Sequence, residues 1–237
     1  MDSERIRALV QPFLATAAAE STPQDPSRRG FSPQTSAGLT DTQLQQISAY
    51  VDLLLRWNTR MNLSAVRDRE SIVTRHFGES LFAARHLFPS NQDRLSPSRV
   101  IDVGSGAGFP GLPMKIWSRD VQLTLIESNQ KKATFLREVI RRLELKDATV
   151  FSGRAENFPA QAEVVTLRAV ERFETALGIA TRLVVPAGRI ALLIGSAQVV
   201  RAQELARDVT WQRATTIPLS SSRVLLIGRK HSFEASY

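Results

Sequence analysis

The sequence predicts an α/β fold: a parallel sheet with helices on both faces, a C-terminal antiparallel hairpin and an N-terminal helical cap. From residue 99 onward, short apolar strands alternate with helical patterns, which is typical of a covered parallel sheet. The first of these strands runs directly into a glycine-rich turn. The last two predicted strands are separated only by Leu219-Ser220-Ser221, and so short a connection requires antiparallel pairing.

The chain has 237 residues, which suits one α/β domain with an appendage or two small domains. It has no cysteine, which excludes disulfides and thiolate nucleophiles and fits the cytoplasm. Its three histidines are too scattered for a metal site, so we expect no metal. No apolar run is long enough to span a bilayer, and no segment resembles a secretory signal. We expect a cytoplasmic monomer without a membrane partner.

Basic residues outnumber acidic ones. Lys and Arg total 31 against 23 Asp and Glu, which gives a formal net charge of +8 and a pI near 10.7. Such an excess favours a polyanionic partner, and RNA is the foremost candidate. The alternative is a basic surface that serves only solubility.

The N-terminal region, residues 1–38, is predicted to hold one helix and a flexible linker. Apolar residues recur at helical spacing over residues 4–20. Residues 21–38 are rich in Ser, Thr, Pro, Gln and Gly, which is the composition of a linker.

Residues 39–95 are predicted to form the helical cap. One helix begins at Thr40, and Gln43 stands at the position that completes a capping box. A second helix is expected from about Asp68 to Leu87, where apolar residues again recur at helical spacing. We expect this second helix to lie over the crevice in which ligands bind.

Residues 96–237 are predicted to form a Rossmann-like domain. Strands are expected at 99–104, 121–127, 148–152, 163–168, 188–195, 210–217 and 222–229. Helices are expected at about 110–118, 129–145, 171–184 and 198–208. Five parallel strands and a terminal hairpin are the layout of class I S-adenosylmethionine-dependent methyltransferases, whereas a dinucleotide-binding Rossmann domain more often keeps a sixth parallel strand.

The first strand leads into the turn Asp102-Val-Gly-Ser-Gly-Ala-Gly-Phe-Pro-Gly111. Gly104 and Gly106 are expected to form the turn, and Gly108 to allow close packing of the next helix on the strand. Phe109 is expected to begin that helix, whose N-terminal N–H groups would face a ligand. A strand, a glycine turn and a helix in this order are typical of a nucleotide-cofactor site.

An acidic residue at the end of the next strand supports this interpretation. Glu127 would lie beside the glycine turn, where a carboxylate can accept hydrogen bonds from both ribose hydroxyls. Together with Asp102 it favours S-adenosylmethionine. However, NAD enzymes place an acid at the same point, and residues 106–111 also fit the dinucleotide pattern. An NAD(P)-dependent oxidoreductase and a purely structural turn are therefore alternatives, as is a solvated strand-end charge for Glu127.

Two further segments are expected to complete the cofactor site. The peptide between Ala155 and Glu156, with the Glu156 side chain, is placed to bond an adenine ring; the alternative is an exposed loop acid. Arg168 ends the fourth strand, where its guanidinium can hold the methionine carboxylate or a phosphate. A helix cap or a surface ion pair is the alternative for Arg168.

Six short motifs between residues 40 and 230 follow one another in a fixed order: Trp57-Asn58, Asn62-Leu63-Ser64, Arg75-His76, residues 102–111, residues 153–156 and Arg168-Ala169. In order and spacing they resemble the RsmG family, ribosomal RNA small-subunit methyltransferase G, also called glucose-inhibited division protein B. The resemblance implies transfer of a methyl group from S-adenosylmethionine to N7 of a guanine in the decoding-region loop of 16S rRNA, with the small ribosomal subunit as partner. It also implies cofactor contacts by Gly104, Phe109, Ala155, Glu156 and Arg168.

Two positions depart from that family. Glu79 stands where the family usually has an aspartate, and Ile194 where it often has a lysine, so the contacts of that lysine are not carried over. Guanine N7 has an in-plane lone pair and no proton, so its methylation needs in-line positioning and no general base. Glu79 is our hypothesis for a catalytic carboxylate that stabilises the positive charge on the ring. The alternative is a surface glutamate paired with Arg75 or Arg85.

RNA contacts are expected mainly from the cap. The candidates are Arg56, Arg60, Arg67, Arg69, Arg75, His76, Arg85 and, in the terminal hairpin, Arg223. Trp57 is either a stacking platform for a base or a core residue. A solvated face is expected for Lys131, Lys132, Arg137, Arg141 and Arg142. A small-molecule methyltransferase and a non-catalytic RNA-binding module are the remaining alternatives.

Overall fold

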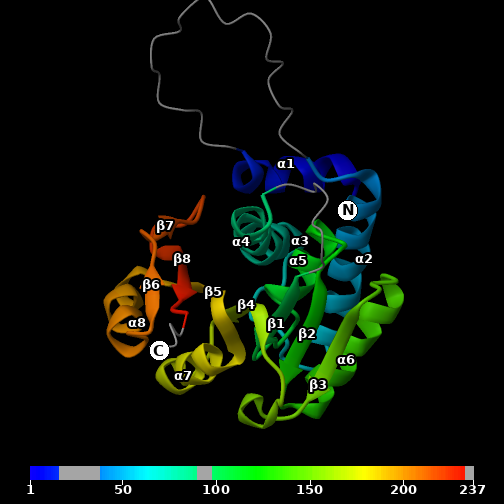
Figure 1. The fold of residues 1–237 in the computed structure, drawn as a ribbon. Helices are drawn as coiled ribbons and strands as arrows, with labels where there is room; N and C mark the ends of the chain where they lie inside the picture. The colour runs from blue at the N-terminus through cyan, green and yellow to red at the C-terminus, as the bar shows by residue number, and fades with distance from the viewer. Residues whose placement is uncertain (16–37, 90–97, 233–237) are drawn as a thin grey trace, which may run out of the picture.

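The computed structural model describes residues 1–15, 38–89 and 98–232 (Figure 1). Within these residues, eight strands form one sheet in the order β3-β2-β1-β4-β5-β8-β6, with β7 paired to β8. The linker predicted over residues 21–38 lies outside the described part of the chain, apart from Gly38.

The strands are β1 (Arg99–Val103), β2 (Gln122–Glu127), β3 (Ala148–Ser152), β4 (Ala162–Arg168), β5 (Val184–Gly195), β6 (Val209–Trp211), β7 (Thr215–Thr216) and β8 (Arg223–Lys230). The helices are α1 (Ser3–Leu14), α2 (Asp41–Asn58), α3 (Arg69–Ile72), α4 (Glu79–Leu87), α5 (Gly111–Trp117), α6 (Gln130–Arg142), α7 (Phe173–Leu183) and α8 (Val199–Leu205). A π-helical segment, η1 (Val73–Gly78), and two 3₁₀ turns, η2 (Ala155–Asn157) and η3 (Ser196–Gln198), complete them.

The five strands β1 to β5 pair in parallel, as predicted. Strand β8 then inserts antiparallel between β5 and β6, which confirms the C-terminal hairpin. The prediction of a single strand over residues 210–217 is wrong in one respect. It is split into β6 and β7, because residues 212–214 leave the ladder between them, and each piece pairs separately with β8.

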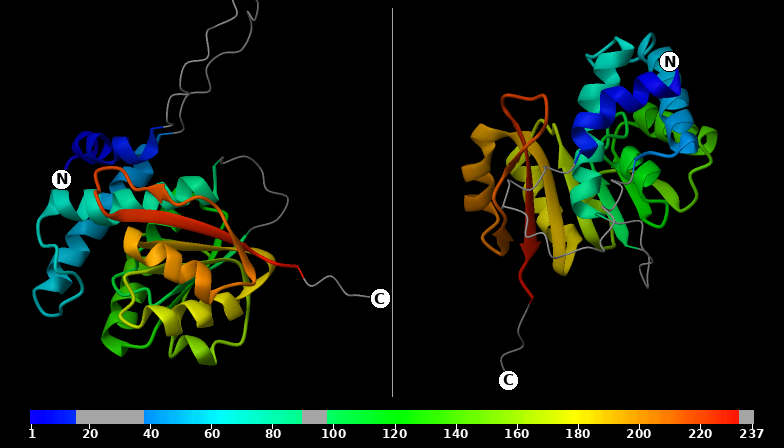
Figure 2. Two further views of the ribbon diagram at one scale, coloured as in Figure 1. Left: turned by 90° about the vertical axis from the view of Figure 1, so that its left-hand side faces the viewer. Right: turned by 90° about the horizontal axis from the view of Figure 1, so that it is seen from above.

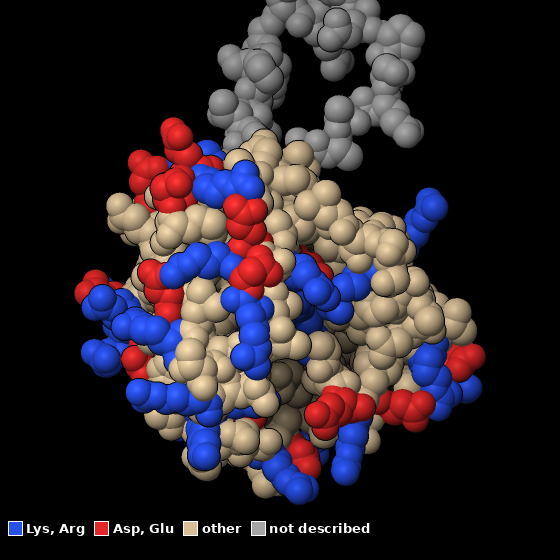
Figure 3. All heavy atoms as spheres, turned by 180° about the vertical axis from the view of Figure 1, so that it is seen from behind, with Lys and Arg blue, Asp and Glu red and all other residues tan. Residues whose placement is uncertain are grey.

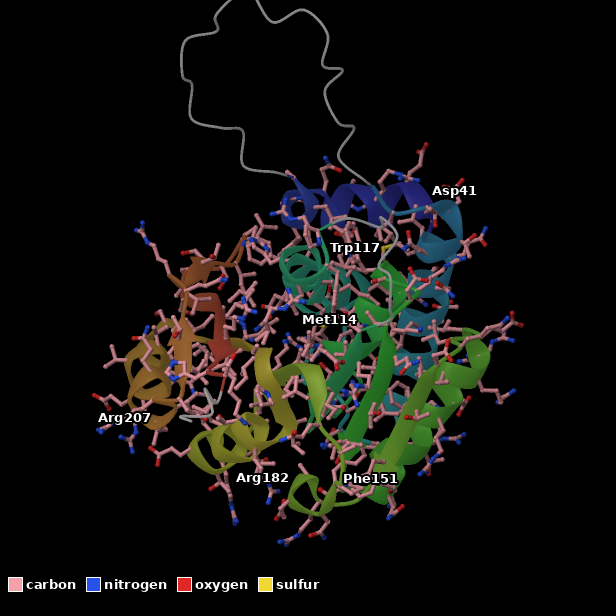
Figure 4. All side chains as sticks on the ribbon, in the orientation of Figure 1. Asp41, Met114, Trp117, Phe151, Arg182 and Arg207 are labelled. Carbon is pink, nitrogen blue, oxygen red and sulfur yellow. The ribbon has the colours of Figure 1, made fainter. Side chains whose placement is uncertain are left out.

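Helices cover both faces of the sheet (Figure 2). The cap helices α1, α2 and α4 pack with α5 and α6 on one face, in a single apolar core. Met114 and Trp117 of α5 lie in this layer between the cap and the sheet (Figure 4). Helices α7 and α8 form a second core on the opposite face. The cap thus covers one face of the sheet. It also lies beside the edge formed by the carboxyl ends of the parallel strands, which we call the ligand edge.

The capping box predicted at the start of α2 is confirmed. The Thr40 N–H donates to Gln43 Oε1 at 2.8 Å, and the Gln43 N–H donates to Thr40 Oγ1 at 3.3 Å. The Gln43 amide also donates to the Ile116 carbonyl at 2.7 Å. Gln43 therefore both caps the start of α2 and ties the cap to α5.

The helix predicted from Asp68 to Leu87 exists, but its middle is π-helical. Asp68 caps its start by accepting the Ser71 N–H at 2.8 Å. Helix α1 packs on the π segment: a Cβ at Gly78 would lie 2.4 Å from the Phe13 ring. The wider π turn and the missing side chain at Gly78 together let α1 approach closely.

Candidate functional site

The glycine turn after β1 is open on the side of Gly104 and Gly106. Both have positive φ, +68° and +57°, a conformation that favours glycine. A Cβ at Gly106 would meet only the Gly104 carbonyl, at 3.8 Å, and a Cβ at Gly104 only a Val170 methyl, at 3.3 Å. No bulky group fills the space in front of these two residues, so a ligand can approach the backbone there.

The second half of the turn differs from the prediction. Helix α5 begins at Gly111 rather than at Phe109, because the Gly108 and Phe109 N–H groups both turn back to the Ser105 carbonyl. The Phe109 ring is buried and stacks on Tyr50, with 5.4 Å between ring centroids. The Phe109 side chain is therefore part of the apolar core beneath the turn.

Gly108 has the expected role toward α5, because a Cβ there would lie 2.5 Å from Leu112 Cδ1, and it has a second role toward the cap. A Cβ there would lie 2.3 Å from Tyr50 Oη, whose hydroxyl donates to the Ala107 carbonyl. Close packing of α5 on the strands also depends on Gly111, where a Cβ would lie 2.6 Å from Leu125. Sequence spacing did not reveal Tyr50, a residue of α2 that holds the turn from 57 positions away.

Asp102 is completely buried beneath the turn and has a structural role. Its carboxylate accepts the Thr166 hydroxyl at 2.7 Å and the Gly111 N–H at 3.2 Å. Burial raises the pKa of Asp102 to about 6, although these hydrogen bonds act in the opposite direction. The Gly111 N–H in the first turn of α5 therefore has an acceptor within the protein.

Glu127 ends β2 and lies directly beside the open turn. Its carboxylate is buried, with 7% of the residue exposed, and accepts the Gly106 N–H at 2.9 Å and the Asn129 N–H at 2.8 Å. Each oxygen has one such donor, which leaves one lone pair on each for a further donor. Glu127 is thus fixed in place and retains the capacity to accept two hydroxyl groups.

The loop after β3 adjoins Glu127. The Gly153 N–H donates to the Glu127 carbonyl at 3.1 Å, and Ala155 is half-buried in the turn that follows. Glu156 is exposed; its carbonyl accepts from Arg182 of α7 at 2.9 Å, and its carboxylate lies 3.6 Å from Arg154. The structure brings this loop to the glycine turn, but the Glu156 side chain is held on its outer side.

Arg168, at the end of β4, is paired with the cap. Its Nη2 lies 2.9 Å from Glu79 Oε2, and Arg223 Nε lies 3.0 Å from the same oxygen. The alternative that placed Glu79 on the surface with Arg75 or Arg85 is wrong, because α4 turns the carboxylate inward. Two guanidinium groups share one carboxylate, so the cluster carries a net positive charge.

His76 completes this cluster and has no free ring nitrogen. Arg168 Nη2 lies 3.1 Å from Nδ1, and Ser64 Oγ lies 2.7 Å from Nε2. Because a guanidinium can only donate, Nδ1 accepts and the proton is on Nε2. Burial, with Arg168 nearby, lowers the pKa of His76 to about 3. The prediction that His76 contacts RNA is therefore not supported, because both ring nitrogens are hydrogen-bonded within the protein.

A small pocket of about 70 Å³ opens at the carboxyl ends of β4 and β5. Arg168, Arg223, Ala169 and Gly195 are among the residues that line it. Arg223 also donates to the Leu193 carbonyl at 3.3 Å. The positive cluster thus faces the ligand edge of the sheet, next to the glycine turn.

The arginines proposed to contact RNA divide into two groups. Arg69 forms an ion pair with Asp52, and Arg85 donates to the Leu14 and Ala15 carbonyls. In the described part of the chain, no carboxylate forms an ion pair with three exposed arginines: Arg56, Arg60 and Arg75. Figure 3 shows Lys and Arg side chains around a hollow near the middle of the face opposite to that of Figure 1.

Residues 1–15, 38–89 and 98–232 contain no group of three His, Asp or Glu side chains that could hold a metal. None of their helices is both long and apolar enough to cross a membrane.

Sequence comparison identifies relatives with one shared description. The family model GidB, rRNA small subunit methyltransferase G, matches residues 43–224. The ribosomal RNA small subunit methyltransferase G of Roseiflexus castenholzii is 41% identical over 202 residues, which cover 80% of this chain and 84% of the relative. The protein of the same name from Streptococcus uberis is 34% identical over 178 residues, covering 73% of this chain and 70% of the relative.

Solved structures with a similar fold include a methylase. Ribosomal protein L11 methylase from Lactobacillus delbrueckii subsp. bulgaricus matches with a TM-score of 0.55 and 12% identity, over 67% of this chain and 80% of that one. TYW2 of P. horikoshii, solved in complex with MeSAdo, matches with a TM-score of 0.52 and 16% identity, over 66% and 63%. The class I methyltransferase fold is thereby confirmed, and this chain belongs to the family of rRNA small subunit methyltransferase G.

Proposed function

We propose that this protein transfers a methyl group from S-adenosylmethionine to N7 of a guanine in the 16S rRNA of the small ribosomal subunit. The observation that carries the proposal is the open turn at Gly104 and Gly106 beside the fixed carboxylate of Glu127, in a member of an rRNA methyltransferase family. Because ribosomal subunits are the proposed partner, we assign the protein to the cytoplasm, and we propose that it acts as a monomer.

The residues at the ligand edge fit S-adenosylmethionine. The open backbone at Gly104 and Gly106 can lie against the cofactor, and Glu127 can accept its two ribose hydroxyls. The Ala155 turn adjoins Glu127 on the side expected for adenine. The net positive cluster of Arg168, Arg223 and Glu79 suits the methionine carboxylate. Gly108 and the ring of Phe109 are left out of this set because they face Tyr50.

The proposed mechanism depends on positioning. S-adenosylmethionine supplies a methyl group that is already activated on sulfonium, and guanine N7 offers a lone pair without losing a proton. The protein therefore needs to hold the two reactants in line and exclude water, which requires no general base. Glu79 is neutralised by two arginines. We assign it a positioning role toward Arg168 and Arg223 in place of the hypothesis that it stabilises the cationic ring.

Two measurements test this function. Radiolabelled S-adenosylmethionine is incubated with the protein and with small subunits from cells that lack the endogenous enzyme; label in 16S rRNA that maps to guanine N7 is expected. Absence of label in rRNA would overturn the proposal. Calorimetry is expected to detect binding of S-adenosylhomocysteine and none of NADH; the reverse result would restore the oxidoreductase alternative.

A further inference from the structure

A groove of about 730 Å³ lies between the C-terminal half of α2 and the N-terminal half of α6, outside the glycine turn. We call it the α2/α6 groove. Its volume lies within the roughly 300–1,000 Å³ typical of ligand pockets. The residues that matter for its chemistry are Arg56, Trp57, Arg60, Lys131, Thr134 and Glu138.

The groove is basic. Arg56, Arg60 and Lys131 are exposed, and none of them forms an ion pair with any carboxylate among the described residues. The one carboxylate that lines the groove, Glu138, accepts the indole N–H of Trp57 at 2.9 Å. Three cations are therefore available to an anionic ligand. Lys131, expected on a solvated face, is indeed exposed, and it also lines the groove because the start of α6 lies against the end of α2.

The groove also presents an aromatic side chain of fixed orientation. Trp57 is half-buried; its hydrogen bond to Glu138 holds one edge, and its ring packs edge-on against Phe135 with 5.6 Å between centroids. A preordered aromatic ring among unpaired cations is the combination by which proteins bind single-stranded nucleic acid: the ring stacks on a base and the cations bind phosphates.

The groove is connected to the positive cluster at the ligand edge. Asn58, next to Trp57, accepts the Leu63 and Ser64 N–H groups at 2.8 and 3.1 Å and donates to the Ser64 carbonyl at 2.8 Å. Ser64 in turn bonds to His76. On the α6 side, Lys131 lies four positions after Glu127 in the sequence. The α2 side of the groove is thus linked by hydrogen bonds to His76, and its α6 side begins one turn of helix after Glu127.

We propose that the α2/α6 groove binds a single-stranded segment of rRNA next to the target nucleotide, through stacking on Trp57 and phosphate contacts with Arg56, Arg60 and Lys131. The inference rests on the proposed function. It assigns to that function a docking site that is separate from the cofactor turn.

The test measures binding of a fluorescein-labelled, single-stranded fragment of 16S rRNA at several salt concentrations. The variant Arg56→Ala/Arg60→Ala/Lys131→Ala is expected to bind at least about tenfold more weakly, and the slope of log Kd against log salt is expected to fall by about 2. The matched control Arg137→Ala/Arg141→Ala/Arg142→Ala removes the same charge from exposed positions of α6 outside the groove. Its affinity is expected to change less than about twofold.

A second variant tests whether RNA must enter the groove, without changing the charge of the residues that line it. Thr134→Trp fills the groove and leaves all three cations in place, and it is expected to weaken RNA binding by about tenfold as well. Calorimetry with S-adenosylhomocysteine is expected to give the same affinity for every variant and for the parent, which also shows that each is folded.

Three outcomes would overturn the groove assignment. One is unchanged RNA affinity in the groove variants, and another is an equal loss in the Arg137/Arg141/Arg142 control. The third is weaker binding to intact subunits with unchanged binding to the RNA fragment, which would indicate a protein partner. Failure of the proposed function looks different: the parent protein itself would then leave 16S rRNA unlabelled.

Discussion

Arg168 and Glu79 form an ion pair of 2.9 Å between the end of β4 and the start of α4. The side chains are only 10% and 6% exposed, and Arg223 lies 3.0 Å from the same carboxylate oxygen. The three side chains therefore join β4, α4 and β8, which are distant in the sequence, at the ligand edge of the sheet.

Replacement of the carboxylate is expected to destabilise the protein. Glu79→Gln leaves two guanidinium groups without their shared counter-charge, at a cost of about 3 kcal/mol in the free energy of unfolding. Urea denaturation followed by circular dichroism measures this loss. Glu79→Asp keeps the charge and is expected to lose clearly less. If Glu79→Gln is as stable as the parent, the cluster contributes nothing to holding the cap on the sheet.

The cofactor proposal makes a prediction at Gly106. Gly106→Val places a β-branched side chain at φ +57° and in the open space before the turn. We expect binding of S-adenosylhomocysteine to be lost in calorimetry while the far-ultraviolet circular dichroism spectrum is retained. The control is Gly178→Ala in α7, where a Cβ meets no atom within 4 Å. It is expected to bind normally and to gain about 0.5–1 kcal/mol of stability. Unchanged affinity in Gly106→Val would show that the cofactor lies elsewhere.

His76 is expected to make stability depend on pH. Its pKa is lowered from 6.5 to about 3 in the folded protein. Between these values the unfolded chain binds the proton and the folded protein does not, so stability falls as pH decreases below about 6.5. The contribution of His76 to this loss is about 2 kcal/mol at pH 5 relative to pH 8, whereas Asp102, whose pKa is raised, contributes in the opposite direction. His76→Gln is expected to flatten this part of a urea-denaturation series, whereas His231→Gln, at an exposed position, is expected to leave it unchanged. An identical acid dependence in parent and His76→Gln would contradict the assignment.

The close contact between α1 and the π segment is tested at Gly78. A methyl group there would lie 2.4 Å from the rigid ring of Phe13, so Gly78→Ala is expected to lower the free energy of unfolding by about 1–3 kcal/mol. Thermal denaturation measures the change. The added alanine would by itself favour the helix, so a net gain in stability would show that α1 does not pack here as described. The double variant Phe13→Ala/Gly78→Ala is expected to be less destabilised than the sum of the two single changes.

Local chemistry made much of the fold predictable. Apolar β-branched runs predicted the five parallel strands, since such strands are buried on both faces. The pairing of Thr40 with Gln43 predicted the start of α2, because both partners are only three positions apart. The position of Glu127 beside the turn was also predicted, because parallel strands end at one edge of the sheet.

The remaining features depend on contacts that no local pattern encodes. Gly108 is packed against Tyr50, which lies 58 positions away along the chain. Arg168 is paired with Glu79, which lies 89 positions away. Sequence spacing could not distinguish the paired Arg69 from the unpaired Arg56, since both are arginines on cap helices. For the same reason the sequence could not show that Lys131 lines a groove with residues of α2.

The cap consists of helices that cover one face of a sheet made entirely of later residues. During translation, α1, α2 and α4 are synthesised before any strand of the sheet. Their apolar sides, with Tyr50 of α2 and Leu81 of α4 among them, have no sheet to pack against until β1 and its neighbours have been made. The enzyme that we propose to act on the small ribosomal subunit therefore emerges from a ribosome with the apolar sides of its cap helices ahead of the sheet that covers them, which makes early chaperone contact at these helices an expected stage of its biogenesis.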